Sequence, residues 1–504
     1  MFSKILIANR GEIAVRVIRA CRDLGIPTVA VFSEIDRTAL HVRFADEAYL
    51  LGPAPATESY LRADKILEIA QKTGAEAIHP GYGFLSENAG FSDACHAAGI
   101  KFIGPRGDSM RALGDKISAR IVAERLKVPI VPGIDCPLKD AGEAKGLAKK
   151  FGYPVLLKAR AGGGGKGMRK VTKPEEMESA FHLASSEAGQ SFGDPSLYLE
   201  KYILEPHHIE VQILGDKKGD VVALGERECS IQRRHQKIVE ESPSPFIRLS
   251  TRKKLFEAAR KIARFAKYEN AGTLEFLVDK DQKFYFLEMN ARLQVEHPVT
   301  EQVTGVDLVK AQIEIAAGGK IPPCPPLTKG GWGDLNYSLE CRIYAEDPDN
   351  NFIPCPGTIN FLRNPEGPGV RVDSAMYAGA EISVYYDPMI AKLITWGGSR
   401  EEAIGRMERA LAEYRIEGVT TNLTFHLALL RHPSFQKGDY DTGFVERSLS
   451  ELKREMHQGY EEIAKMAVEI HRRTSSSIAI ANHDRGEGVR SEWHTIARQE
   501  GLRE

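Results

Sequence analysis

Residues 273–290 read TLEFLVDKDQKFYFLEMN, and this stretch decides the fold at the centre of the chain. Two apolar, aromatic runs flank polar residues at 280–282, which is typical of a β-hairpin. Antiparallel pairing places Glu275 opposite Glu288 within about one step. Two carboxylates among aromatic strands are costly without a cation between them, and hard oxygen ligands suit Mg²⁺ or Mn²⁺. We therefore expect Glu275 and Glu288, with Asn290 as a third oxygen donor, to bind a metal that bridges phosphates. A solvated sheet face is the alternative.

The hairpin continues into residues 290–298, which read NARLQVEHP. If this segment stays extended, a period of two places Asn290, Arg292, Gln294 and Glu296 on one side of it. Close to a metal-bound phosphate, an arginine and a carboxylate can fix a small oxyanion and remove its proton. The alternative is an Arg292–Glu296 salt bridge on an exposed strand.

A glycine run, GGGGKGM, occupies residues 162–168. Residues without side chains let consecutive backbone N–H groups close over phosphate oxygens. The run is not a Walker A loop, because residues 167–171 look like a strand, and a mobile lid between two strands fits better. Lys158 ends the preceding apolar strand at 155–157 and needs an anion there. The two features together predict phosphate binding. The alternatives are a merely flexible loop and a Lys158 side chain that reaches solvent.

Residues 229–237, CSIQRRHQK, form a fourth cluster. They are too rich in cations for a core and too short for a nucleic-acid tail. An anion site is predicted, and a basic solvated loop is the alternative.

The N-terminal region alternates short β-rich runs with helical patterns, as in Ile5–Ala8 and residues 29–32. This alternation predicts βαβ units and a parallel sheet. The first turn, NRGE at residues 9–12, lacks the G-x-G-x-x-G of a dinucleotide site. Glycine and proline at residues 79–83 and 104–105 break the later strands, as expected at the carboxyl edge of a sheet, where ligands bind.

The pattern divides the chain into four parts. We expect an α/β parallel-sheet domain at 1–113, an α+β domain at 114–330 with a lid subdomain at about 131–203, a further domain at 334–446, and a helical or partly disordered tail at 447–504. Proline and glycine at residues 322–333 mark the clearest linker.

The α+β domain shows both helical and strand periodicity. A helix begins near Asp115, and Ile209, Val211 and Ile213 alternate with polar neighbours in a strand pattern. A second helix places apolar residues on one buried stripe: Leu255, Ile262 and Phe265.

Composition sets the bounds of function. A chain of 504 residues allows about three or four domains. The 68 basic and 69 acidic side chains leave a formal net charge of −1, which favours neither nucleic acid nor an anionic membrane. Seven cysteines with no C-x-x-C pair indicate reduced thiols and a cytoplasmic protein. No signal-peptide pattern or long apolar run is found, so secretion and membrane spanning are not expected.

These motifs together resemble the ATP-grasp superfamily and, within it, the biotin carboxylase subunit of acetyl-CoA, propionyl-CoA or pyruvate carboxylases. Residues 1–446 carry the resemblance. The specific stretches are IANRGEIA at 7–14, HPGYGFLSEN at 79–88, QRRHQK at 232–237 and EMNARLQVEHP at 288–298. The resemblance implies an N-terminal Rossmann-like parallel-sheet domain, an ATP-grasp domain with a glycine-rich lid, and a C-terminal biotin carboxylase domain.

The resemblance also implies roles for individual residues. ATP phosphates are expected at Lys116, Lys158, Gly163, Gly164, Gly165, Lys166, Gly167 and Met168. The adenine is expected at the hinge of Glu200, Lys201, Tyr202 and Ile203, and the nucleotide site is completed by His208, Gln232 and His235. Two Mg²⁺ or Mn²⁺ ions are expected on Glu275 and Glu288, with Asn290 on one of them. Bicarbonate is expected at Lys237, Arg292, Gln294 and Val295. Glu296 is then the base that deprotonates bicarbonate, and Arg342 stabilises the enolate-like ureido oxygen of biotin.

The implied reaction is the first half-reaction of an acyl-CoA or pyruvate carboxylase, as in fatty acid biosynthesis. Bicarbonate attacks the γ-phosphate of ATP, and the resulting carboxyphosphate gives CO₂ and a phosphate that takes the N1 proton of biotin. A biotin-bearing Met-Lys-Met turn is not found, and Lys465 is predicted to be a surface residue. Biotin is therefore expected on a separate biotin carboxyl carrier protein.

The remaining expected partners are a second copy of the chain in a homodimer and a carboxyltransferase subunit, with no nucleic acid and no membrane. The tail at 447–504 is expected either to dock a carboxyltransferase or the carrier protein, or to be disordered. Two rival functions remain at this point: another ATP-grasp carboxylate-amine ligase, such as a carbamoyl-phosphate or purine-pathway synthetase, and an inactive nucleotide-binding scaffold. The downstream acyl acceptor is not encoded in these residues.

Overall fold

The computed structural model describes residues 1–114, 116–134, 136–159, 168–323, 336–457, 465–466 and 468–471, and for residues 116, 117, 191 and 192 it describes only the backbone. The chain divides into two units, Met1–Leu452 and Lys453–Glu504. In the second unit Lys465 is exposed, as expected for a surface lysine. The helix α15 (Phe444–Met456) spans the division between the units.

The first part of the chain forms a five-stranded parallel sheet with the order β3-β2-β1-β4-β5. Its strands are β1 (Ile5–Ile7), β2 (Thr28–Ser33), β3 (Glu47–Gly52), β4 (Ala77–His79) and β5 (Lys101–Phe102). Its helices are α1 (Gly11–Asp23), α2 (Leu40–Phe44), α3 (Ala63–Thr73), α4 (Ala89–Ala97) and α5 (Gly107–Gly114). The order reverses beside β1, so the loops after β1 and β4 meet at the carboxyl edge. There Asn9 donates hydrogen bonds to the carbonyls of Pro80 and Tyr82, both at 2.7 Å.

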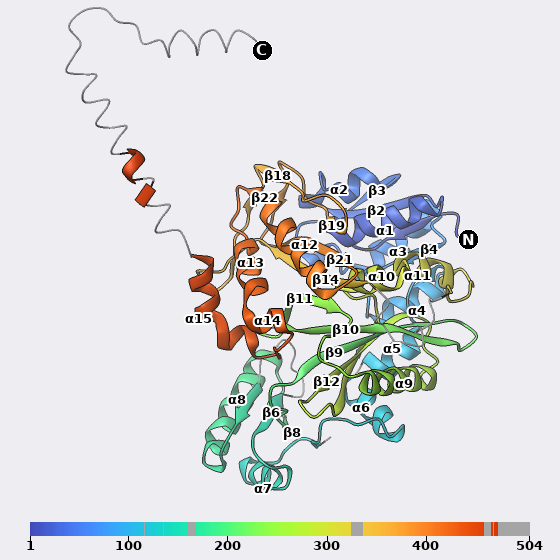
Figure 1. Ribbon diagram of the computed structural model, residues 1–504. Helices are drawn as coiled ribbons and strands as arrows, with labels where there is room; N and C mark the ends of the chain where they lie inside the picture. The colour runs from blue at the N-terminus through green and yellow to red at the C-terminus, as the bar shows by residue number, and fades with distance from the viewer. Residues whose placement is uncertain are drawn as a thin grey trace, which may run out of the picture. The chain divides into compact units, whose positions relative to one another are not determined.

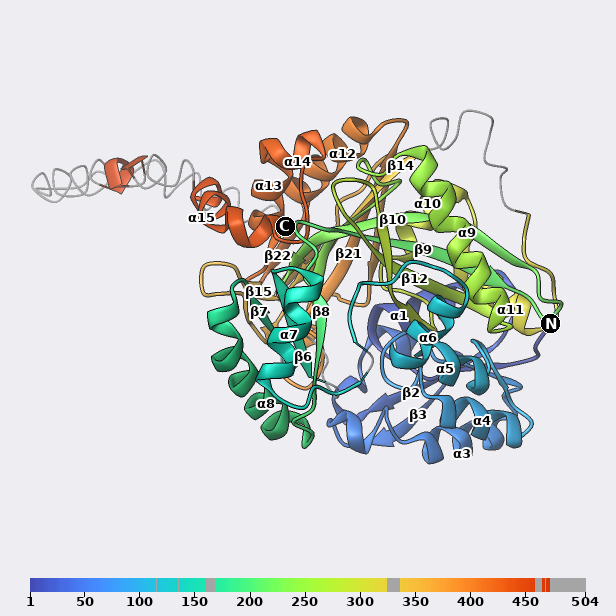
Figure 2. The same cartoon turned by 90° about the horizontal axis from the view of Figure 1, so that it is seen from below.

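An eight-stranded antiparallel sheet forms the centre of the first unit (Figures 1 and 2). In sheet order its strands are β13 (Phe284–Asn290), β12 (Asn270–Val278), β9 (His207–Gly215), β10 (Val221–Arg233), β11 (Gln236–Ser242), β14 (Tyr337–Tyr344), β21 (Met389–Gly397) and β19 (Val370–Ser374). The pairing of β11 with β14 joins strands on either side of the predicted linker. The two expected domains therefore share one continuous sheet.

Helices cover both faces of this sheet. Arg252 of α9 (Leu249–Phe265) contacts Glu226 on one face, at 2.7 Å. Thr300 of α10 (His297–Thr304) accepts a hydrogen bond from Arg227 on the other face, at 2.8 Å. Adjacent residues of β10 thus point to opposite helices, as strand geometry requires.

A small antiparallel sheet with the order β7-β6-β8 lies beside the central one and has its own apolar core. It consists of β6 (Val155–Ala159), β7 (Met168–Val171) and β8 (Leu197–Lys201), with α7 (Ala141–Phe151) and α8 (Met177–Phe192), which lie at the lower edge of Figure 1. The pairing of β6 with β7 confirms that the glycine run connects two strands. The run itself, residues 162–167, lies outside the described residues.

The other helices and short strands complete the fold. The helices are α6 (Lys116–Arg125), α11 (Leu308–Ala316), α12 (Arg400–Glu413), α13 (Leu423–Arg431) and α14 (Pro433–Lys437). The strand pairs are β15 (Glu346–Asp347) with β16 (Ile353–Pro354), β17 (Gly357–Thr358) with β20 (Glu381–Ile382), and β18 (Phe361–Arg363) with β22 (Arg415–Glu417). Among the described residues, every helix is too short or too polar to cross a bilayer.

The predicted fold class, an α/β domain followed by α+β structure, is confirmed. Two local predictions were wrong. The strand at Asn290 ends there, and residues 291–296 form a turn that leads into α10. Phe265 is 43% exposed, because it is the last residue of α9. The guanidinium of Arg125 lies over its ring, 5.2 Å from the ring centre. The strand predicted at Ile209, Val211 and Ile213 is confirmed as β9, and because it is buried on both faces its alternating polar residues face other protein groups.

Glu12 of α1 connects the parallel-sheet region to the central sheet. Its Oε1 atom lies 3.2 Å from Nζ of Lys392 on β21. Burial raises the pKa of Glu12 to about 7; Lys392 and Arg371 oppose this shift, and Asp373 adds to it. The folded protein therefore keeps the Glu12 proton to a higher pH than the unfolded chain does. The resulting stability is complete below the ordinary glutamate pKa and is lost as the pH rises through about 7.

We expect the substitution Glu12→Gln to reduce this loss. Between pH 5 and pH 8 the unfolding free energy of the variant should fall by on the order of 2 kcal/mol less than that of the wild type. Urea unfolding at a series of pH values measures both curves. Parallel curves for the two proteins would contradict the raised pKa of Glu12.

Candidate active site

A row of charged side chains crosses one face of the central sheet. Strand register pairs Glu288 with Glu275, Glu275 with Glu210, and Glu210 with Arg227. Residues that pair directly across strands point to the same face. The register thus brings three carboxylates and a guanidinium into one line from β13 to β10. Glu275 and Glu288 lie opposite each other, as the hairpin pattern predicts.

Lys237 of β11 is the cation that connects this row to Glu296. Its ammonium donates hydrogen bonds to Glu210, Glu275 and Glu296 at 2.7, 2.9 and 2.8 Å. Burial disfavours the charge of Lys237, but the three carboxylates outweigh this effect and raise its pKa well above the ordinary value. Lys237 is therefore a permanent positive charge inside the protein.

Glu296 bridges Lys237 to Arg342 of β14. Its second oxygen accepts a hydrogen bond from Arg342 at 3.0 Å, while Arg342 also donates to Glu240 of β11 at 2.7 Å. Burial opposes the negative charge of Glu296, yet Lys237 and Arg342 hold its pKa well below the ordinary range. Burial raises the pKa of Glu240 to about 7. The pair of carboxylates around Arg342 thus consists of one strong and one weak acid.

Arg292 lies in the turn that follows β13. Its guanidinium donates to Glu87 at 2.9 Å, to Gln294 Oε1 at 2.9 Å and to Asn290 Oδ1 at 3.0 Å. The Gln294 amide in turn donates to Glu275 at 3.2 Å. The expected group of Asn290, Arg292 and Gln294 is therefore connected, although a turn and not a strand holds it together.

His208 of β9 and Gln232 of β10 join this cluster through Glu275. His208 Nε2 lies 3.0 Å from Glu275 Oε2, and its Nδ1 lies 2.9 Å from the Gln232 amide. By contrast, His235 is exposed in the turn between β10 and β11 and has a positive φ of 67°.

The hinge of the small sheet holds a separate group of charges. Glu200 of β8 accepts hydrogen bonds from Lys158 of β6 and, at 3.2 Å, from Arg120. The protein itself thus supplies the anion that a lysine at the end of an apolar strand requires. Lys201 donates to the carbonyls of Gly152 and Tyr153, at 2.7 and 3.1 Å. The part of the chain that the structure describes does not include the Lys116 side chain or the residues Gly163, Gly164, Gly165, Lys166 and Gly167.

The donors around Glu288 fit a divalent cation. Glu288 and Asn290 lie on one face of β13 and line a cavity of about 390 Å³ together with Glu87. Carboxylate and amide oxygens are the ligands that Mg²⁺ prefers. Asn290 turns its amide nitrogen to Glu275 at 2.9 Å, so only a rotation of this side chain brings its oxygen to a metal between the two glutamates.

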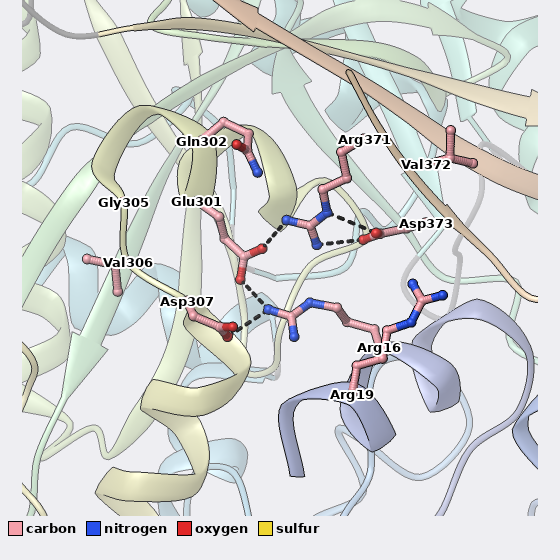
Figure 3. A pocket seen from close by; sticks show the side chains of 10 residues that line it. All are labelled: Arg16, Arg19, Glu301, Gln302, Gly305, Val306, Asp307, Arg371, Val372 and Asp373. Atoms are coloured by element: carbon pink, nitrogen blue, oxygen red, sulfur yellow. Dashed lines mark hydrogen bonds and ion pairs between the residues drawn. The ribbon is translucent and has the colours of Figure 1, made fainter. Parts of the chain in front are cut away.

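A second cavity, of about 450 Å³, lies away from this cluster (Figure 3). Arg16 of α1 and Arg371 of β19 both reach Glu301 of α10 there, at 2.9 and 2.7 Å. Arg371 also holds Asp373 with two nitrogens. These ion pairs neutralise one another, and the cavity contains none of the residues predicted from the sequence.

Several residues of the cluster were missed at the sequence level. They are Glu87, Glu210, Arg227 and Glu240. Glu210 could have been found from its position, because it is a charged residue between the apolar Ile209 and Val211 of a strand. The structure brings possible ligand atoms of His208, Glu210 and Glu275 within 4.8 Å of one another. Pairing between strands that are distant in sequence creates this group, so local patterns could not reveal it.

Comparison with known proteins gives consistent matches along the chain. Family models described as biotin carboxylase, N-terminal domain; carbamoyl-phosphate synthase L chain, ATP binding domain; and biotin carboxylase C-terminal domain match residues 1–110, 115–323 and 340–447. Biotin carboxylase of Halalkalibacterium halodurans is 52% identical over 89% of this chain and 98% of its own length. Biotin carboxylase 1 of Bacillus subtilis is 50% identical over 88% of this chain and 98% of its own length.

A solved structure extends this similarity to three dimensions. The biotin carboxylase domain dimer of Hydrogenobacter thermophilus 2-oxoglutarate carboxylase, in complex with MgADP, ADP and bicarbonate, superimposes with a TM-score of 0.82. It is 49% identical in sequence, and the match covers 89% of this chain and 98% of that one.

Proposed function

Because the chain belongs to the biotin carboxylase family, we propose that the cluster around Lys237 and Glu296 is its reaction centre. The protein is an ATP-dependent ligase that carboxylates biotin with bicarbonate and forms ADP and phosphate. The observation that carries the proposal is the buried row of charges Lys237, Glu296 and Arg342, in which two cations flank one carboxylate. Such a row suits a site that must hold several small anions together.

Bicarbonate binds beside Arg292, Lys237, Gln294 and the backbone of Val295 in this proposal. Glu296 lies next to these donors through its contact with Lys237 and removes the bicarbonate proton. The bicarbonate oxygen then attacks the γ-phosphorus of ATP, so that carboxyphosphate forms and ADP leaves. Positioning and charge neutralisation supply most of the rate in such a transfer.

The ATP phosphates lie near Glu275, Glu288 and Asn290 in the proposed arrangement. These three residues would hold two Mg²⁺ or Mn²⁺ ions, which would supply positive charge to the phosphates. The ATP-binding residues are those expected from the sequence: Lys116, Lys158, Gly163, Gly164, Gly165, Lys166, Gly167, Met168, Glu200, Lys201, Ile203, His208, Gln232 and His235. Lys158 must then exchange Glu200 for a phosphate when the nucleotide binds.

Arg342 acts in the second step. Carboxyphosphate decomposes to CO₂ and phosphate, the phosphate takes the N1 proton of biotin, and N1 attacks CO₂. The negative charge that develops on the ureido oxygen needs a fixed cation. Arg342 is suited to this role, because burial disfavours its charge but Glu240 and Glu296 raise its pKa well above the ordinary value.

We propose the partners from the same resemblance. Biotin arrives on a biotin carboxyl carrier protein, and a carboxyltransferase uses the carboxybiotin. A homodimer is supported by the dimer of the Hydrogenobacter relative. A cytoplasmic location is supported by the six described cysteines, all of which are free thiols. We also propose that the chain divides into domains at 1–113, 114–330 and 334–446 and a tail at 447–504.

Wild-type protein with ATP, Mg²⁺ and free biotin tests the proposed function. ADP release should require bicarbonate and should increase with biotin, and carboxybiotin should form from labelled bicarbonate. A rate of ADP release that depends on neither bicarbonate nor biotin would contradict the proposal. It would instead favour another ATP-grasp ligase, for which neither Arg342 nor the cluster at residues 232–237 has a role.

A further inference from the structure

Lys392 of β21 is a fully buried lysine outside the residues assigned so far. Its side chain has 0% exposure, and its ammonium donates a hydrogen bond to the backbone carbonyl of Val295 at 3.0 Å. Strand register pairs Lys392 with Arg342 on one side and with Asp373 on the other. Lys392 therefore points to the same face of the sheet as the reaction centre.

Two acidic side chains also lie near the Lys392 ammonium. Glu12 Oε1 lies at 3.2 Å and Asp373 Oδ2 at 3.8 Å. Asp373 is already bound by two nitrogens of Arg371, as Figure 3 shows. Of these contacts of the Lys392 ammonium, the shortest is the hydrogen bond to the Val295 carbonyl. Burying an ammonium costs several kcal/mol unless it is well paired, so this arrangement needs a reason.

The Val295 carbonyl lies in the turn that presents the reactive side chains. Gln294 precedes it and contacts Glu275 and Arg292. Glu296 follows it and contacts Lys237 and Arg342. The turn carries no strand pairing, so a contact with one of its peptide groups is an effective way to fix its position.

We propose that Lys392 is a positioning residue for bicarbonate, which holds the Val295 peptide group so that Gln294 and Glu296 face the bound anion together. The proposal rests on the function given above. Lys392 does not touch bicarbonate itself, because its hydrogen bond approaches the turn from the sheet. Nucleotide binding, which uses other strands and the lid, does not depend on this contact.

The substitution Lys392→Met tests the proposal. The KM for bicarbonate should rise by roughly tenfold, as expected for the loss of a charge-assisted hydrogen bond, while the KM for ATP changes by less than about twofold. The matched control is Lys65→Met, which removes an ammonium from the Leu51 carbonyl at 2.6 Å in the parallel-sheet domain and should leave both constants unchanged.

A KM for bicarbonate that stays within twofold of the wild type would overturn the proposal, as would an equal rise in both constants. If Lys392→Met does not fold, the double variant Glu12→Gln, Lys392→Met removes both buried charges. This variant should likewise raise the KM for bicarbonate and leave the KM for ATP nearly unchanged. Failure of both variants to fold would also overturn it, because Lys392 would then serve stability alone. Wild-type protein without bicarbonate-dependent ADP release would instead contradict the proposed function.

Discussion

Replacement of Glu296 by glutamine is expected to lower bicarbonate-dependent ADP release by about 10³-fold, the usual contribution of a general base. Glutamine has nearly the same shape as glutamate but cannot accept the bicarbonate proton. Lys237 keeps Glu210 and Glu275 as partners in this variant, and Arg342 keeps Glu240. The fold should therefore persist while the proton transfer fails.

In the proposed mechanism, the low pKa of Glu296 means that this carboxylate becomes an effective base only when the substrates are bound. With Lys237 and Arg342 beside it, its pKa lies well below the ordinary range, and so weak a base removes protons poorly. Bicarbonate and the ATP phosphates bring negative charge to the same two cations. Sharing these cations raises the pKa of Glu296 toward a useful value. The proposed mechanism thus couples deprotonation by Glu296 to the presence of substrate.

Single-turnover measurements of ADP formation at saturating ATP test Glu296→Gln. The matched control is Glu226→Gln on β10, because Glu226 is equally buried but faces Arg252 on the opposite side of the sheet. The control should retain the wild-type rate. A rate for Glu296→Gln within about fivefold of the wild type would exclude Glu296 as the base.

Replacement of Arg292 by alanine is expected to lower kcat/KM for bicarbonate by at least about 100-fold. The guanidinium is the cation that anchors Gln294 and Asn290 and remains accessible in the turn, where its side chain is 20% exposed. Its ion pair with the partly exposed Glu87 contributes little to stability. The melting temperature should accordingly change by only a few degrees.

Initial rates at several bicarbonate and ATP concentrations separate the effects of Arg292→Ala on the two substrates. The control variant Arg409→Ala removes an exposed i,i+4 ion pair with Glu413 on α12 and should leave the rates unchanged. A defect confined to the KM for ATP would show that Arg292 serves the nucleotide and not bicarbonate.

The hairpin and the glycine run show which features were predictable from the sequence. The register of Glu275 and Glu288 followed from apolar alternation and turn position, because a hairpin pairs residues that are close in the chain. The strands on both sides of the glycine run were predictable for the same reason. The prediction that residues 290–296 stay extended was wrong, because Glu87 and Lys392, which fix this segment as a turn, come from remote parts of the sequence.

The amino-acid sequence by itself determined the fold class, the family resemblance and the residue types that the reaction requires. Local periodicity and short motifs carry that information. Only the tertiary structure decided that Lys237 contacts three carboxylates, that Glu200 neutralises Lys158, and that Lys392 lies under the Val295 peptide group. These contacts join residues that are 27 to 97 positions apart in the chain. Their geometry depends on how strands and helices pack, which no local pattern contains.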